Sequence, residues 1–266
     1  MNRFTELLEK LGLKNKAEEK KEPEKLGFSQ RMKKLLNMEE TFEKVTDTDV
    51  LDAVLQSDME NLKVTKETVN HQAFSMAVEA ILEAKTIYIC GIRSCEPLAD
   101  FLGFYLNMIF DNVKVIHTSS ASEILEQMMR ISAEDVFIGI SFPRYSMRTL
   151  KAMELANNRS ARVISITDSI HSPMNIYSSM NLLAESQMAS VVDSLTAPLS
   201  LINALVAALC LRRKDELKES LETLDQLYED YQIYGNDEME DAEEEILIYQ
   251  GGTVFSGDIF QKGMKK

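Results

Sequence analysis

Hydroxyl and guanidinium side chains gather in the segment SFPRYS, where Ser141, Arg144 and Ser146 lie within six residues. The apolar run 135–140 precedes them, and the apolar positions that follow have helical spacing. A turn between a strand and a helix presents unpaired backbone N–H groups and the positive end of the helix dipole, to which serine and arginine add donors. The chemistry indicated is the binding of a small anion such as a phosphate. The alternative is that the serines cap the helix and Pro143 begins it.

Two further polar turns have the same form. Ser94 and Cys95 follow the predicted strand 86–91, and Ser119 and Ser120 follow the predicted strand 113–117. Because the carboxyl ends of parallel strands meet at one edge of a sheet, and strands 1 and 3 are neighbours at its switch point, these turns are expected to converge. Three polar turns at one edge favour a small-ligand pocket over simple helix capping.

The elements that position these turns alternate between strands and helices. We predict strands near 86–91, 113–117, 135–140, 162–167 and 181–185, which are separated by helices near 95–110, 120–131, 145–158 and 193–211. Apolar runs without alternation indicate strands buried on both faces, and helical crossovers imply parallel pairing. The predicted fold is a three-layer α/β sandwich with a five-stranded, mainly parallel sheet.

Composition divides the chain into three parts. Residues 1–48 hold a short amphipathic helix at 1–12, a charged linker at 14–25 and some helical spacing at 26–36. Residues 49–211 form the predicted α/β domain, which opens with amphipathic helices at 49–63 and about 66–84. Residues 212–266 are a tail with a polar helix after Arg212, acidic residues at 236–245 that resemble disordered segments, and an end with no clear period.

Charge and cysteine usage limit the possible functions. The net charge is −14, and residues 212–250 alone carry fourteen acidic against four basic residues, a balance of −10. A nucleic-acid-binding protein usually shows a basic face instead. The three cysteines are odd in number and have no metal-ligand spacing, which indicates neither a disulfide framework nor a metal site. With no apolar signal core and no stretch long enough to span a bilayer, we expect a cytoplasmic protein with no membrane role.

Four motifs together resemble the sugar isomerase (SIS) domain of the RpiR/MurR family of bacterial transcriptional regulators. They are GIRSCEPLADFLGFYL, ISFPRYSMRTLKAMELA, RVISITDS and DSLTAPLSLINALVAAL, and the likeness runs from about residue 49 to 211. The resemblance implies a flavodoxin-like sheet that binds a phosphosugar through the serines of the first and third turns. It thus points to Ser94, Cys95, Ser141 and Ser146. Cys95 stands where serine is usual, and residues 143–144 replace a common Ser-Gly, although a subgroup of the family has the same SFPRYS.

The N-terminus departs from the family pattern. RpiR-type regulators have an N-terminal helix-turn-helix domain whose recognition helix enters the major groove. Here MNRFTELLEKLG resembles its first helix and LGFSQRMKKLL its last segment, but KNKAEEKKEPEK stands between them and contains too few apolar residues for two packed helices. We therefore interpret residues 1–48 as a truncated or degenerate helix-turn-helix and do not expect this chain alone to bind DNA sequence-specifically.

The leading interpretation is a ligand-responsive phosphosugar-binding regulator of carbohydrate metabolism that needs no cofactor. One alternative is a sugar-phosphate isomerase in which His117 or Glu185 acts as the base, since an imidazole suits such proton transfer. Another is a SIS scaffold that binds nothing. The segments ALVAALCL and FLGFYLNMIF are nearly all apolar and predict a homo-oligomer, a dimer or a tetramer. Helices that are apolar on nearly all sides need a second packing layer to bury their remaining apolar surface.

Overall fold

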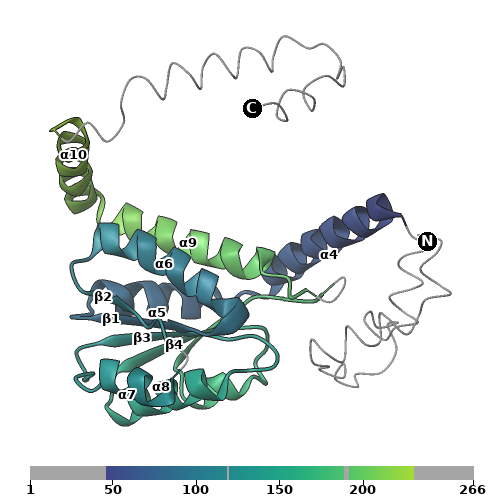
Figure 1. The fold of residues 1–266 in the computed structure, drawn as a ribbon, viewed down its shortest axis with the longest axis horizontal. Helices are drawn as coiled ribbons and strands as arrows, with labels where there is room; N and C mark the ends of the chain where they lie inside the picture. Colours follow the sequence, from purple (N-terminus) through teal and green to yellow (C-terminus); the bar gives the residue numbers. More distant parts are fainter. Residues whose placement is uncertain (1–45, 119, 189–191, 231–266) are drawn as a thin grey trace, which may run out of the picture. The chain divides into compact units, whose positions relative to one another are not determined.

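The computed structural model describes residues 46–118, 120–188 and 192–230 (Figure 1). These residues fall into two compact units divided after Lys214, and each unit is described by itself. The helix predicted at 1–12, the linker at 14–25, the segment 26–36, the tail beyond 230 and Ser119 lie outside the described residues.

The centre of the fold is a five-stranded parallel sheet. Its strands are β1 (Ile87–Gly91), β2 (Val113–Val115), β3 (Val136–Ile140), β4 (Arg162–Thr167) and β5 (Met180–Leu183). They lie in the order β2-β1-β3-β4-β5, and every neighbouring pair is parallel. All residues of β1 and β3 are buried, as expected for strands covered on both faces. The order reverses direction between β1 and β3, so the predicted switch point is confirmed.

Helices cover both faces of the sheet (Figure 1). On one face lie α5 (His71–Leu82) and α6 (Glu96–Ile109), with α9 (Thr196–Arg212) packed on both. On the other face lie α7 (Ala121–Gln127), α8 (Met147–Asn158) and the 3₁₀ turn η2 (Pro173–Ile176). The core consists of branched aliphatic residues of the strands and the inward faces of these helices. The predicted α/β class and parallel sheet are confirmed, and α9 adds a layer beyond α5 and α6.

Helix α4 (Asp47–Thr68) precedes the α/β core and contacts α9. It begins with a capping box in which Thr46 and Asp49 satisfy each other's backbone N–H groups. It is longer than the predicted 49–63, and the next helix starts at His71 instead of 66, because the Asn70 side chain accepts the Ala73 N–H and sets a new N-cap. The predicted pair of N-terminal helices is therefore present with a shifted boundary.

Helix α4 also holds the segment that follows β5. The Asp58 carboxylate accepts hydrogen bonds from the Ser194 hydroxyl at 2.6 Å and the Thr196 hydroxyl at 2.8 Å. Farther along the helix, the Asn61 amide donates to the Gln187 carbonyl at 2.8 Å. Bonds to a carboxylate are stronger than neutral ones, so the start of α9 is firmly positioned.

The polar segment beyond α9 forms the separate helix α10 (Lys214–Asp230), since α9 ends at Arg212. No single helix within 46–118, 120–188 and 192–230 is long and apolar enough to cross a membrane. The remaining predicted ends differ by up to four residues: β2 stops at Val115, β5 starts at Met180 and α7 stops at Gln127.

Candidate functional site

The turn after β1 is unusually tight. Gly91 ends the strand, and a Cβ at this position would overlap the Cys95 carbonyl oxygen. Arg93 then begins the 3₁₀ turn η1 (Arg93–Cys95) with φ of 62°, a left-handed conformation that costs a residue other than glycine about 1–2 kcal/mol. Strain of this kind concentrates at ligand-binding sites, and here it fixes the direction in which the chain leaves the sheet.

The turn after β3 is held by its own serines. The Ser141 hydroxyl oxygen accepts the Ser146 N–H at 3.0 Å, and Ser141 is 3% exposed. Ser146 is the N-cap of α8, and its hydroxyl oxygen accepts the Thr149 N–H at 3.4 Å. The predicted capping role is therefore present, but each hydroxyl still has a proton to donate.

Two contacts fix this turn to its neighbours. The Tyr145 hydroxyl donates to the Asp168 carboxylate at the end of β4, at 2.7 Å. The buried Cys95 of the first turn lies beside the Phe142 backbone of the third turn, whose N–H favours the thiolate and partly offsets the effect of burial on the Cys95 pKa. Burial raises the pKa of the Cys95 thiol to about 11, so this thiol is neutral at physiological pH. Cys95 is thus a buried, neutral member of the cavity lining.

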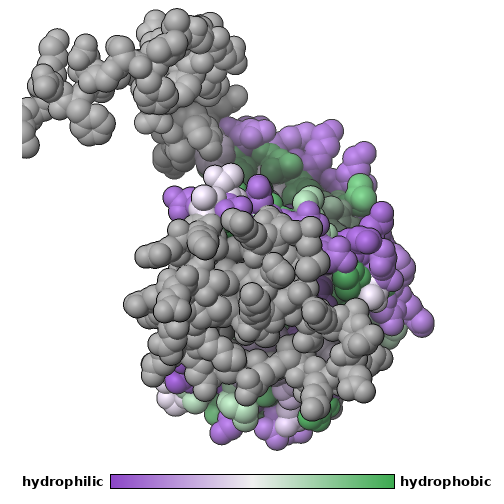
Figure 2. Space-filling view, turned by 90° about the vertical axis from the view of Figure 1, so that its right-hand side faces the viewer, coloured by the Kyte–Doolittle hydropathy of each residue, from purple (hydrophilic) through white to green (hydrophobic). Residues whose placement is uncertain are grey.

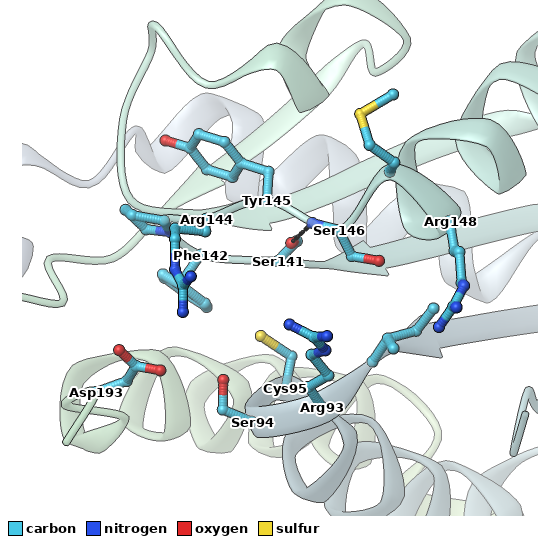
Figure 3. Close-up of a pocket in the computed structure, with 13 residues that line it drawn as sticks. Arg93, Ser94, Cys95, Ser141, Phe142, Arg144, Tyr145, Ser146, Arg148 and Asp193 are labelled. Carbon is cyan, nitrogen blue, oxygen red and sulfur yellow. Dashed lines mark hydrogen bonds between the residues drawn. The ribbon is translucent and has the colours of Figure 1, made fainter. Parts of the chain in front are cut away.

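Between these two turns lies a cavity of about 350 Å³ (Figure 3). Such a volume is within the range of small-molecule sites, roughly 300–1,000 Å³. Its lining comes from the first turn, the third turn, the start of α8 and one residue before α9: Ile92, Arg93, Ser94, Cys95, Ser141, Phe142, Pro143, Arg144, Tyr145, Ser146, Met147, Arg148 and Asp193. The cavity therefore opens at the carboxyl edge of the sheet, where the strand order reverses.

The lining is electropositive. Figure 3 shows Arg93, Arg144 and Arg148 directed toward the space between the turns, with Asp193 at one side. The N-terminus of α8 adds the partial positive charge of its dipole. Three guanidinium groups, one carboxylate and several hydroxyls make a site suited to an anionic, hydroxyl-rich ligand.

Of the predicted site residues, five line this one cavity: Ser94, Cys95, Ser141, Arg144 and Ser146. Ser120 does not line the cavity, and its hydroxyl is 3.0 Å from that of Ser122 in α7. The first and third turns line one cavity, as expected from the sequence, whereas Ser120, the described serine of the second turn, does not line it.

Sequence reasoning missed three charged lining residues, Arg93, Arg148 and Asp193. Arg93 directly precedes Ser94, and Arg148 is the second residue of α8, so both lie close to residues that the sequence did indicate. Asp193 lies far away in sequence and carried no signal.

The two residues considered as isomerase bases lie elsewhere. His117 Nδ1 is 3.3 Å from the Asp100 carboxylate, and His117 lines a different hollow. Glu185 follows β5 and does not line the cavity; its backbone N–H donates to the Thr65 hydroxyl at 2.8 Å. Partial burial is the main cause that raises the pKa of the Glu185 carboxyl, and the nearby Asp168 charge adds to it. Among the described residues no group of three His, Cys, Asp or Glu side chains is placed to hold a metal ion.

The comparisons with known proteins agree with this architecture. Residues 80–208 match the model of the SIS domain family. This part of the chain is therefore similar to a SIS domain, and the matched range includes both turns of the cavity. None of the curated proteins matches the chain in sequence.

Solved structures with the same fold include regulators and an isomerase. The chain is 26% identical to the sugar isomerase domain of an RpiR transcription factor from Sphaerobacter thermophilus, with a TM-score of 0.62 over 65% of this chain and 96% of that one. It is 21% identical to the Vibrio vulnificus NanR protein complexed with ManNAc-6P, with a TM-score of 0.61 over 77% and 75%. A phosphoheptose isomerase from Francisella tularensis is 16% identical, with a TM-score of 0.52 over 62% and 98%.

Proposed function

We propose that the chain is a phosphosugar-binding module of the RpiR-regulator type, in which the cavity between the first and third turns holds the ligand. The observation that carries this proposal is the convergence of Ser94, Ser141 and Ser146 with three arginines around one cavity of about 350 Å³. The similarity to the RpiR domain, and to NanR with its bound ManNAc-6P, supports the same assignment.

The phosphate docks against the third turn in this proposal. The hydroxyls of Ser141 and Ser146, the Arg144 guanidinium and the first N–H groups of α8 are its donors, and Ser94 approaches from the opposite turn. A phosphate carries about −1.5 to −2 charges near neutral pH, which the helix start and arginine balance. The sugar hydroxyls then occupy the remainder of the cavity.

An isomerase is the second candidate, because a phosphoheptose isomerase shares the fold. Aldose–ketose isomerisation needs a general base within hydrogen-bond reach of the substrate carbon. Among the described residues that line the cavity, Asp193 is the one carboxylate and there is no histidine. The positions of His117 and Glu185 outside the lining favour binding without turnover.

The proposed mode of action does not include specific DNA recognition by this chain alone. The linker in residues 14–25 replaces the sequence expected for a recognition helix, and the net charge is −14. We propose instead that ligand occupancy is transmitted to a partner through α4, which is hydrogen-bonded to the segment before α9 that carries Asp193.

We further propose that the protein is a homo-oligomer. Helix α6 leaves Phe104 58% exposed, and α4 leaves Leu51 and Met59 each 56% exposed. Figure 2 shows hydrophobic patches among hydrophilic residues on the face it presents. Burial of such side chains in a subunit interface is favourable at about 25 cal/mol per Å² of apolar surface. Multi-angle light scattering at micromolar concentration is expected to give at least a dimer mass, and a monomer mass would remove this part of the proposal.

The direct test is a thermal-shift screen of the full chain against a panel of phosphosugars at millimolar concentration, with an isomerase assay of every hit. A ligand that binds the native state raises the melting temperature by mass action. We expect stabilisation by at least one phosphosugar, no stabilisation by its dephosphorylated form, and no turnover. Turnover of a hit would establish the isomerase, and a panel without any hit would contradict phosphosugar binding.

A further inference from the structure

The cavity has more cationic groups than a single phosphate needs. Arg93, Arg144 and Arg148 all line it, and within residues 46–118, 120–188 and 192–230 none of their guanidinium groups has a hydrogen-bond or ion-pair partner. Elsewhere in the same unit, arginine side chains form ion pairs: Arg162 with Glu83 at 2.7 Å and Arg212 with Glu79 at 2.6 Å. Three unpaired guanidinium groups directed at one space repel one another, which an anionic ligand would relieve.

Two of the three arginines also line a second, adjoining hollow. This hollow, of about 270 Å³, is lined by Gly91, Ile92, Arg93, Glu96, Thr118 and Arg148. It shares Ile92, Arg93 and Arg148 with the main cavity, whereas Arg144 lines the main cavity alone. The two shared arginines therefore stand where the hollows adjoin, and Figure 3 shows Arg148 on the side of the main cavity away from Arg144, with Arg93 between them.

We infer that the ligand is an acidic phosphosugar, with a carboxylate at the end of the sugar away from the phosphate, held by Arg93 and Arg148. This inference rests on the proposed function and names its substrate class. In the second hollow, two arginines against Glu96 leave one net positive charge, which matches a carboxylate better than a second phosphate of about −1.5 to −2. Thr118, also in that lining, supplies a hydroxyl beside it.

The backbone of Arg93 supports this role independently. Its φ of 62° is strained for an arginine, and glycine would adopt it without cost. An arginine kept in a conformation that favours glycine indicates that its side chain serves a purpose at this position. The same fact supplies a suitable variant, because Arg93→Gly removes the guanidinium and leaves the turn free to keep its shape.

The experiment compares two probes that differ at one carbon. Calorimetric titration of the full chain with 6-phosphogluconate and with glucitol 6-phosphate measures the contribution of the carboxylate, since the second probe has a hydroxymethyl group in its place. Gluconate, which lacks the phosphate, is the control for binding of any carboxylate. Because a hydrogen bond to a charged group is stronger than one to a neutral group, we expect 6-phosphogluconate to bind at least tenfold more tightly than glucitol 6-phosphate.

Variants then assign the effect to residues. Arg93→Gly and Arg148→Gln are each expected to lower the affinity for 6-phosphogluconate at least tenfold more than the affinity for glucitol 6-phosphate. Arg159→Gln, at the far end of α8, is the matched control and is expected to change neither. The inference of an acidic ligand would be overturned if the wild type bound 6-phosphogluconate and glucitol 6-phosphate equally well. It would also be overturned if 6-phosphogluconate still bound more tightly than glucitol 6-phosphate to both variants. Neither result would contradict phosphosugar binding itself. No binding of either phosphate at millimolar concentration would overturn the proposed function together with it.

Discussion

Replacing Ser141 with alanine is expected to lower both the stability of the protein and its affinity for a phosphosugar. The Ser141 hydroxyl accepts the Ser146 N–H at 3.0 Å in a buried position, so the variant leaves this donor without its acceptor. Ser146 is only half-buried, and water can partly replace the lost bond. The expected loss is about 1 kcal/mol of unfolding free energy, which corresponds to roughly 2–4 °C in the melting temperature of a domain of this size.

The loss of affinity has a separate origin. The Ser141 hydroxyl proton is free to be donated to a phosphate oxygen, and a hydrogen bond to a charged group is worth about 1.5–3 kcal/mol. The dissociation constant is therefore expected to rise by one to two orders of magnitude. Calorimetric titration measures it, and urea unfolding without ligand measures the stability of the same sample.

Two further serine variants separate the effects. Ser94 is exposed in the opposite turn, so Ser94→Ala is expected to weaken binding with little change in stability. Ser120→Ala is the control, because Ser120 lines neither hollow at the arginines. If Ser141→Ala lost stability but kept its affinity, and Ser94→Ala also kept its affinity, the serines would be helix caps and the reasoning would be refuted.

Three other results are expected. Gly91→Ala forces a Cβ against the Cys95 carbonyl, so circular dichroism should show a clear loss of melting temperature, and an unchanged value would contradict the tight turn. The pKa of the Glu185 carboxyl is raised above its ordinary value of 4.5, so the native state binds this proton more tightly than the unfolded state and the contribution of Glu185 to stability rises as the pH falls toward 5. In urea titrations the wild type should therefore gain stability relative to Glu185→Gln as the pH is lowered from 7 toward 5, and a difference that does not change with pH would refute this. Duplex DNA should bind weakly and without sequence preference in an anisotropy titration, and nanomolar affinity for a defined operator at physiological salt would show that the N-terminal segment was misinterpreted.

The sequence predicted the sheet well because its strands are buried on both faces. Val136–Ile140 is an apolar run of strand length, β4 (Arg162–Thr167) has three apolar residues among its central four, and the polar turns mark where the strands end. The boundary between the first two helices was wrong because it depends on one side-chain bond, from the Ala73 N–H to Asn70, that hydrophobic spacing does not encode.

The candidate site could be predicted only in part. Serines stood out because they follow strands, and parallel pairing brings the ends of β1 and β3 together. Asp193 enters the cavity through the segment that Asp58 of α4 positions, a contact across more than 130 residues that no local pattern indicates. The left-handed Arg93 was missed because an arginine gives no sign of a conformation that usually belongs to glycine.

The central claim is that the cavity between the first and third turns binds the phosphate of a phosphosugar. A crystal structure of the full chain with 6-phosphogluconate, or with the strongest hit of the thermal-shift screen, tests it most directly. The account predicts the phosphorus atom within hydrogen-bonding reach of the Ser141 and Ser146 hydroxyls and the start of α8, with Arg144 beside it. A ligand bound with its phosphate at any other edge of the sheet would contradict the claim.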